Sequence, residues 1–199
     1  MRVPRPPMPE PDPPIVLFPQ QKDWESWLAA NHATATGIWL RLAKKGSAER
    51  SVSYSEALEA ALCYGWIDAQ KKGESEQFWL QRFTPRRSKS IWSKVNREKA
   101  VALTKAGRMQ PAGLEQVERA KADGRWDAAY DSPGNAGAPD DFAAALARSA
   151  RARAFYGTLD RANVYAILWR IQTAKKAETR ARRIRQFVEM LEKHEKLHP

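Results

Sequence analysis

Apolar residues in the first part of the chain follow helical and then extended spacing. Trp24, Trp27 and Leu28 fall at positions i, i+3 and i+4, which predicts a helix over residues 20–32. Apolar and polar residues then alternate over residues 38–43, which predicts a strand. The chain therefore starts with a helix followed by a strand.

The clearest predicted helix begins at Ser53. Ser53 and Glu56 have the S-x-x-E spacing of a capping box, in which each side chain bonds the other residue's backbone N–H. An apolar stripe follows at helical spacing, and Gly65 stands where such a helix is expected to end. The stripe consists of Tyr54, Ala57, Leu58, Ala61 and Leu62.

Two more strands and two more helices are predicted next. Residues 66–70 and 77–84 have strand patterns and are joined by a polar turn around residues 72–76. Helical spacing then runs from about residue 90 to 106. Pro111 is well placed as the first residue of a short helix, because its missing N–H costs nothing there.

The second part of the chain has an almost wholly helical pattern. Residues 127–139 are rich in Gly, Pro, Asp and Asn, which indicates a linker. Beyond it, helical patterns cover residues 140–147, 150–156, 161–173 and 178–194.

These elements predict an α+β fold, with a small antiparallel sheet packed with helices and then a helical C-terminal part. Prolines crowd the first residues of the chain and favour extended, open conformations. We expect a flexible Pro-rich arm at residues 1–19, an α+β domain at 20–126, the linker at 127–139 and a helical region at 140–199.

Composition narrows the classes of partner. The 199 residues carry a net charge of +11, which favours anionic partners such as nucleic acid, phosphates or acidic membrane surfaces. A single cysteine, Cys63, excludes an internal disulfide and fits a reducing cytosol. Neither a secretory signal nor an apolar run long enough to span a membrane is recognisable, so we expect a cytoplasmic protein.

Several kinds of chemistry have no counterpart in the sequence. One cysteine and three histidines are too few and too scattered for a zinc site. The chain has no P-loop, no G-x-G-x-x-G and no G-x-S-x-G motif. We therefore expect no metal and no cofactor, and binding rather than catalysis.

The strongest candidate site is the junction between the strand at 77–84 and the helix predicted from residue 90. Arginines and hydroxyl groups gather there, and the free N–H groups of a helix start attract anions. Asp68, on the neighbouring strand, is expected to pair with Arg82 or Arg86 and to orient it. The predicted ligand-binding residues are Asp68, Arg82, Arg86, Arg87, Ser88, Ser90 and Trp92.

Two alternatives remain open. The first is a nucleic-acid-associated protein that uses the Arg-rich last helix through Arg180, Arg182, Arg183 and Arg185, with weak, nonspecific binding at low salt. The second is an enzyme acting on a small anionic substrate, with Asp68 as base and the arginines as a clamp. For each site the plain alternative is a solvated surface or a structural ion pair.

Six segments carry a resemblance to a known family, namely residues 24–32, 53–68, 83–96, 107–113, 123–126 and 174–184. Together they resemble the YdeI/OmpD-associated family, also called bacteriocin-protection proteins. The resemblance extends over about residues 16–195 and implies a small bacterial protein without an established catalytic mechanism. Its name implies protection against cationic peptides and association with an outer-membrane porin. We therefore expect a non-enzymatic binding or stress-protection protein whose ligand is a small anion or a phosphorylated molecule.

Overall fold

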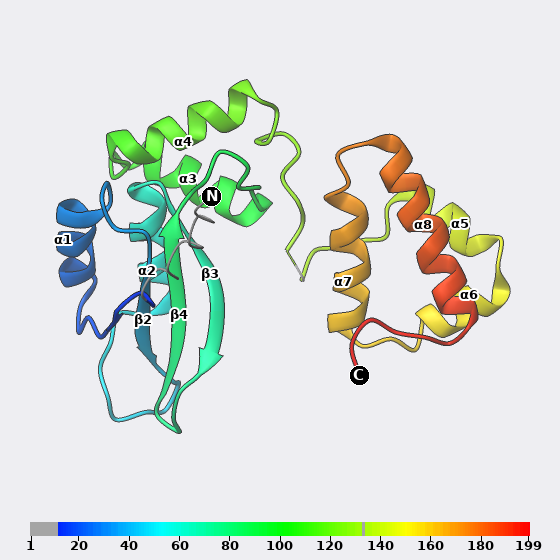
Figure 1. Cartoon of the computed structure of the whole chain (residues 1–199), viewed down its shortest axis with the longest axis horizontal. Coiled ribbons are helices and arrows are strands. Elements are labelled where there is room, and N and C mark those ends of the chain that lie inside the picture. The colour runs from blue at the N-terminus through cyan, green and yellow to red at the C-terminus, as the bar shows by residue number, and fades with distance from the viewer. Residues whose placement is uncertain (1–11, 133) are drawn as a thin grey trace, which may run out of the picture. The chain divides into compact units, whose positions relative to one another are not determined.

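Backbone contacts divide the chain into two units, and each is described by itself. A computed structural model describes residues 12–132 and 134–199 of the protein (Figure 1). The first unit consists of the chain up to Ser90 together with Lys99–Ala122, and the second of Ile91–Glu98 together with Asp123–Pro199. The predicted domain limits, 20–126 and 140–199, follow the sequence continuously, whereas the second unit also includes residues 91–98 from within the span of the first.

The first unit contains a four-stranded sheet in the order β1-β2-β4-β3. The strands are β1 (Ile15–Val16), β2 (Ile38–Ala43), β3 (Trp66–Gly73) and β4 (Phe78–Pro85). β2, β4 and β3 pair antiparallel as predicted, but β1 pairs parallel with β2, so the sheet is mixed.

The predicted Pro-rich arm is docked at its C-terminal end. Residues 1–11 of that arm lie outside the described residues. β1 lies beside β2, the carbonyl of Pro14 accepts a hydrogen bond from the N–H of Trp39, and Phe18 is 8% exposed. Residues 15–18 therefore belong to the folded first unit.

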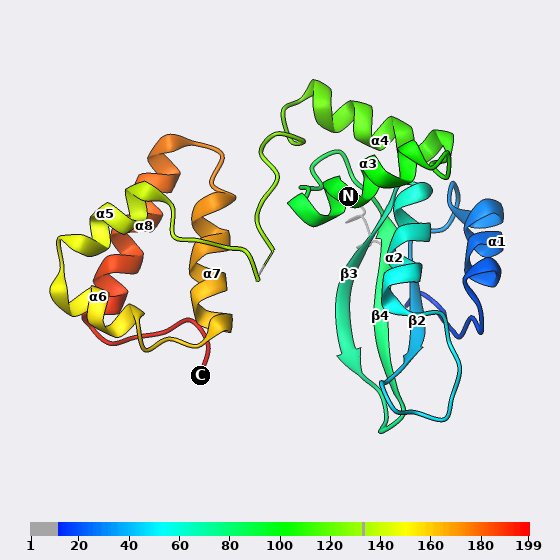
Figure 2. The same ribbon diagram turned by 180° about the vertical axis from the view of Figure 1, so that it is seen from behind.

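One face of this sheet is covered by helices. α2 (Tyr54–Cys63) crosses that face, and α1 (Gln21–Asn31) packs beside α2 (Figures 1 and 2). The core between them holds the fully buried side chains of Trp24, Leu28 and Phe83. No helix of the described residues lies over the opposite face, which we call the open face.

α2 begins as the sequence predicts. The Oγ of Ser53 accepts a hydrogen bond from the N–H of Glu56 at 3.3 Å, and the Glu56 carboxylate accepts one from the N–H of Ser53 at 2.9 Å. The helix ends before Gly65, whose φ of 75° lies in the left-handed region that favours glycine. The capping box and the glycine thus fix both ends of α2.

α4 (Pro111–Ala122) begins at Pro111, as predicted, and approaches the end of α2 very closely. The N–H of Gln110 donates to the carbonyl of Cys63 at 3.1 Å. A Cβ atom added to Gly113 would lie 2.2 Å from that same carbonyl oxygen. Only glycine fits at this contact between the two helices.

α3 (Lys94–Lys105) begins later than the predicted start at residue 90. The Oγ of Ser93 accepts a hydrogen bond from the N–H of Asn96 at 3.2 Å, so Ser93 caps the helix. Ser90, at the predicted start of the helix, lies before it, and its Oγ accepts a hydrogen bond from the N–H of Arg87 at 2.9 Å.

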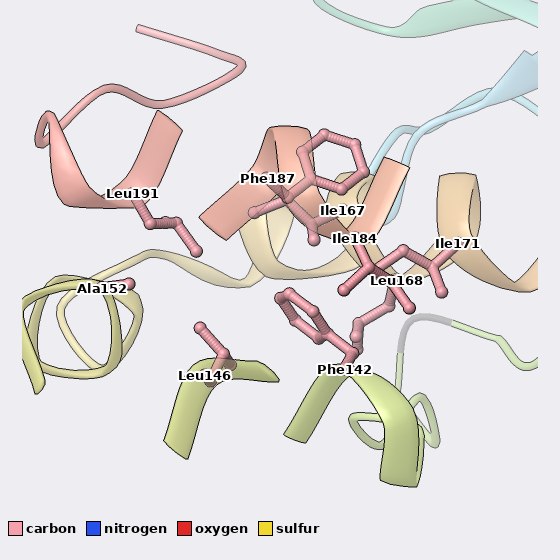
Figure 3. Packing of buried hydrophobic residues seen from close by; sticks show 9 residues of the cluster. All are labelled: Phe142, Leu146, Ala152, Ile167, Leu168, Ile171, Ile184, Phe187 and Leu191. Atoms are coloured by element: carbon pink, nitrogen blue, oxygen red, sulfur yellow. The ribbon is translucent and has the colours of Figure 1, made fainter. Parts of the chain in front are cut away.

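The second unit is helical, as predicted for the C-terminal part. Its helices are α5 (Asp140–Ala147), α6 (Ala150–Tyr156), α7 (Arg161–Gln172) and α8 (Ala177–Glu192). Their apolar faces meet in one core (Figure 3), formed by Phe142, Leu146, Ala152, Ile167, Leu168, Ile171, Ile184, Phe187 and Leu191.

Residues 91–98 add an aromatic contact to the second unit. Trp92 is 1% exposed, and its ring lies edge-on to that of Trp126 with centroids 5.0 Å apart. Ser93 forms an isolated parallel bridge with Tyr130.

No helix of the described chain is long and apolar enough to cross a membrane.

Candidate functional site

A polar cavity of about 440 Å³ lies in the first unit, where β4 ends and β2 begins. One wall is the turn at residues 33–36, and another is the last part of β4 and the residues after it. The lining residues are Asp12, Pro13, Ala33, Thr34, Ala35, Thr36, Arg82, Pro85 and Arg87. The cavity thus brings together Arg82 and Arg87, two of the predicted site residues.

Strand register places Arg82 at this cavity. Ile38 pairs with Phe83, so Gly37 lies beside Thr84 at the start of β2. A Cβ atom on Gly37 would lie 3.3 Å from the Thr84 methyl group and 3.6 Å from the Nε of Arg82. Gly37 therefore lies next to the side chain of Arg82 at the edge of the cavity.

The Arg82 guanidinium is only partly satisfied within the described residues. Its Nη1 donates to the Gln70 side-chain oxygen at 3.3 Å, while its Nε is buried without a hydrogen-bond acceptor. Burial of a donor without an acceptor is costly, and a charge removed from water attracts counter-charge more strongly. An anion near Arg82 would offset part of this cost.

Arg87 is exposed and presents the second cation. Its backbone is held in a turn, because the N–H of Arg87 donates to Ser90 Oγ and the N–H of Ser90 donates to the Arg87 carbonyl, both at 2.9 Å. No ion pair between described residues involves Arg82 or Arg87. Within the described part of the chain, both charges are therefore without an ion-pair partner.

The other predicted site residues lie outside the cavity lining. Arg86 is 7% exposed, and its N–H donates to the carbonyl of Gly65 at 2.9 Å, so it anchors the end of β4. Ser88 is exposed in the turn after it. Trp92 belongs to the second unit, where it packs against Trp126.

Asp68 has a different partner from the one predicted. It accepts a hydrogen bond from the Tyr54 hydroxyl at 2.8 Å, on the helix-covered side of the sheet, because it stands opposite Phe83. Arg82 precedes Phe83 in β4 and so points to the open face. Asp68 and Arg82 therefore lie on opposite faces of the sheet.

The arginines of α8 are divided between packing and solvent. Arg180 donates to the Asp141 carboxylate at 2.6 and 2.8 Å, and these hydrogen bonds hold the pKa of Asp141 below its usual range. Arg183 donates to the carbonyl of Arg170. Only Arg182 and Arg185 of the four predicted nucleic-acid contacts are exposed without such a role.

Neither a metal site nor a reactive thiol emerges from the described part of the chain. No group of three or more His, Cys, Asp or Glu side chains there could hold a metal ion. Burial raises the pKa of the Cys63 thiol to about 11, so the thiol stays protonated at neutral pH. Cys63 serves as a small apolar residue of the core.

Two family models match the chain, one in its N-terminal part and one in its C-terminal part. A family model described as "Domain of unknown function (DUF8412)" matches residues 16–116, about half of the chain. The chain belongs to the DUF8412 family. A second model, "Bacteriocin-protection, YdeI or OmpD-Associated", matches residues 135–194. No curated protein and no solved structure matches the chain.

The second match confirms the YdeI/OmpD-associated resemblance, and it does so through the C-terminal part. The resembling segments before residue 116 fall within the DUF8412 match instead. The cavity walls at residues 33–36 and 82–87 also lie in the DUF8412 region, whereas Arg182 and Arg185 lie in the YdeI/OmpD-associated region. The two candidate surfaces thus belong to different family regions.

Proposed function

We propose that the first unit binds a small anion, phosphate or the phosphate group of a larger molecule, in the cavity between the 33–36 turn and the end of β4. The proposal rests on one observation. Arg82 and Arg87 meet in that cavity, and neither has an ion-pair partner among the described residues. Thr34 and Thr36, in the wall formed by the 33–36 turn, supply hydroxyl groups suited to phosphate oxygens.

The chemistry of the lining favours phosphate over a larger apolar ligand. Arginine presents several N–H donors in a planar fork that matches two oxygens of a phosphate. Asp12 contributes one carboxylate to the lining, so the cavity carries two positive charges and one negative charge. This balance favours a compact anion over a purely apolar ligand.

The protein acts, in this proposal, as a non-enzymatic binding protein of the cytoplasm. The alternative enzyme would need Asp68 as a base next to the arginines, but Asp68 lies on the other face of the sheet and is bonded to Tyr54. The single cysteine, which excludes an internal disulfide, fits a reducing compartment.

A protective role belongs to the same proposal. A chain with a net charge of +11 repels a cationic peptide at long range. We therefore assign any stress-protection activity to the bound anion rather than to capture of such a peptide.

Isothermal titration calorimetry with inorganic phosphate at low ionic strength tests whether the cavity binds this anion. The wild type should bind, and Arg87→Ala should weaken binding about 10-fold or more, since a charge-assisted hydrogen bond contributes roughly 1.5–3 kcal/mol. Arg182→Ala is the matched control, because it removes the same charge from an exposed position in the second unit. Its phosphate affinity should equal that of the wild type.

Two results would overturn the proposal. The first is a wild type with no measurable affinity for phosphate. The second is an Arg87→Ala variant that binds as well as the Arg182→Ala control, because the site would then not involve Arg87.

A further inference from the structure

The open face of the first unit's sheet carries an aromatic ring among cations. Trp39 stands directly opposite Arg82, and both side chains point to this face. Arg41 and Lys72 each stand opposite Leu80, two residues further along the strands, and so share the same face. β2, β3 and β4 thus contribute side chains to one surface, seen in Figure 1 without a helix in front of it.

The ring of Trp39 lies over the sheet. Lys72 Nζ is 4.5 Å from the centre of that ring, although Lys72 comes from β3 and Trp39 from β2, with β4 between them. Leu80 is only 2% exposed in that middle strand, although no helix of the described residues covers this face. The side chains of Trp39 and Lys72 therefore reach across β4 and cover Leu80.

The second aromatic residue on this face, Phe78, already has a cation over its ring. Arg41 lies 5.6 Å from the centre of the Phe78 ring and donates three hydrogen bonds to the Glu74 carboxylate, at 2.6–3.0 Å. A guanidinium held in this way keeps its place over Phe78. Lys72, by contrast, has no ion pair within the described chain, so Trp39 is the ring that a ligand can reach.

We propose that the open face binds single-stranded nucleic acid, with an unpaired base stacked on Trp39 in the place that Lys72 occupies here. Lys72 then turns to a phosphate, and Arg82 contacts the next one along the strand. Stacking of a base on an aromatic ring contributes more than an exposed cation–π contact, so the exchange is favourable. A net charge of +11 raises the local concentration of any polyanion.

The nature of the surface selects single strands over duplexes. A base within a duplex is already stacked and paired, so its flat side cannot meet a tryptophan on a sheet. An unpaired base has both sides free, and every base offers one, so little sequence preference is expected. The inference goes beyond the anion cavity. Arg82 is common to both sites, but the stacking contact with Trp39 does not require Arg87 or the 33–36 turn.

Fluorescence anisotropy of a labelled oligothymidylate of about 12 nucleotides, a length that spans such a site, tests the inference with the full chain. Trp39→Ala should weaken binding about tenfold, and Trp39→Phe should keep part of the affinity, because a smaller ring still stacks. Thermal melting of each variant verifies that it is folded.

Lys72→Ala should lower the magnitude of the slope of log K against log salt by about 0.7, the value for one phosphate contact on a single strand.

The matched control is the double variant Arg182→Ala/Arg185→Ala, which removes two exposed charges from α8. Its affinity for the single strand should fall less than that of Trp39→Ala. The inference is overturned if the control loses more affinity than Trp39→Ala, or if folded Trp39→Phe and Trp39→Ala both bind like the wild type. Equal affinity for the oligonucleotide and its duplex would also overturn it.

Arg87→Ala separates this inference from the anion cavity. That variant should bind phosphate about 10-fold or more weakly and keep its affinity for the oligonucleotide. A wild type that binds the oligonucleotide through Trp39 but shows no affinity for phosphate would refute the cavity alone.

Discussion

Replacing Gly113 with alanine tests the close contact between α2 and α4. The added Cβ atom would lie 2.2 Å from the Cys63 carbonyl oxygen, 2.8 Å from the Cys63 carbonyl carbon and 2.8 Å from the Leu62 carbonyl oxygen. All three are backbone atoms in the last turn of α2, so no side-chain rotation can relieve the overlap. α4 must move away by roughly 1 Å to restore normal van der Waals distances.

The free energy of unfolding should fall by about 1–3 kcal/mol, the usual cost of overpacking a well-packed core. The same movement would weaken the hydrogen bond from the N–H of Gln110 to the Cys63 carbonyl. It would also uncover the Cys63 thiol, which is 3% exposed and has a pKa raised to about 11 by burial. A thiol-specific reagent should therefore label Cys63 faster in the variant.

Chemical denaturation and thiol labelling measure the two effects side by side. Gly73→Ala is the control in the same unit, because no atom lies within 4 Å of its added Cβ and its φ is not positive. Its unfolding free energy should stay within about 1 kcal/mol of the wild type. If Gly113→Ala also stays in that range and its Cys63 reacts at the wild-type rate, the close packing of α4 on α2 is wrong.

Two further predictions concern hydrogen bonds at helix ends. Ser53→Ala should lower the unfolding free energy by about 1 kcal/mol through loss of the α2 cap, and an unchanged denaturation midpoint would show that the capping box contributes nothing. Asp141→Asn should destabilise the protein at pH 7, because Arg180 lowers the folded-state pKa of Asp141 and so favours the ionised folded protein. The difference in unfolding free energy between wild type and variant should shrink as the pH falls below about 4, the pKa of Asp141 in the unfolded chain. It should vanish once Asp141 is protonated in both the folded and the unfolded state. A difference that persists in acid would show that the substitution acts through packing instead.

Local signals in the sequence predicted much of the first unit. The S-x-x-E spacing fixed the start of α2 at Ser53, and Pro111 marked the start of α4. Both signals act through neighbouring backbone groups, so they can be recognised without knowledge of the fold. Ser90 shows the limit of this approach, since its hydroxyl bonds the Arg87 N–H and the cap role passes to Ser93.

The candidate site depended on contacts that spacing does not reveal. Arg82 and Arg87 were recognised by their charge, but Thr34 and Thr36 lie in a turn without any anion-binding pattern. They line the same cavity as the arginines because β2 pairs with β4, which brings the turn before β2 beside the end of β4. Trp39 was likewise seen only as part of a strand, because the position of Lys72 over its ring requires three strands in register.

The assignment of residues 91–98 to the second unit has a consequence for synthesis on the ribosome. The partners of this segment, Trp126 and Tyr130, are made later, and a ribosome adding about 5–20 residues per second needs a few seconds to pass from Glu98 to Tyr130. During that interval Trp92 lacks the ring against which it packs. A nascent chain at this stage should therefore expose Trp92 to chaperones.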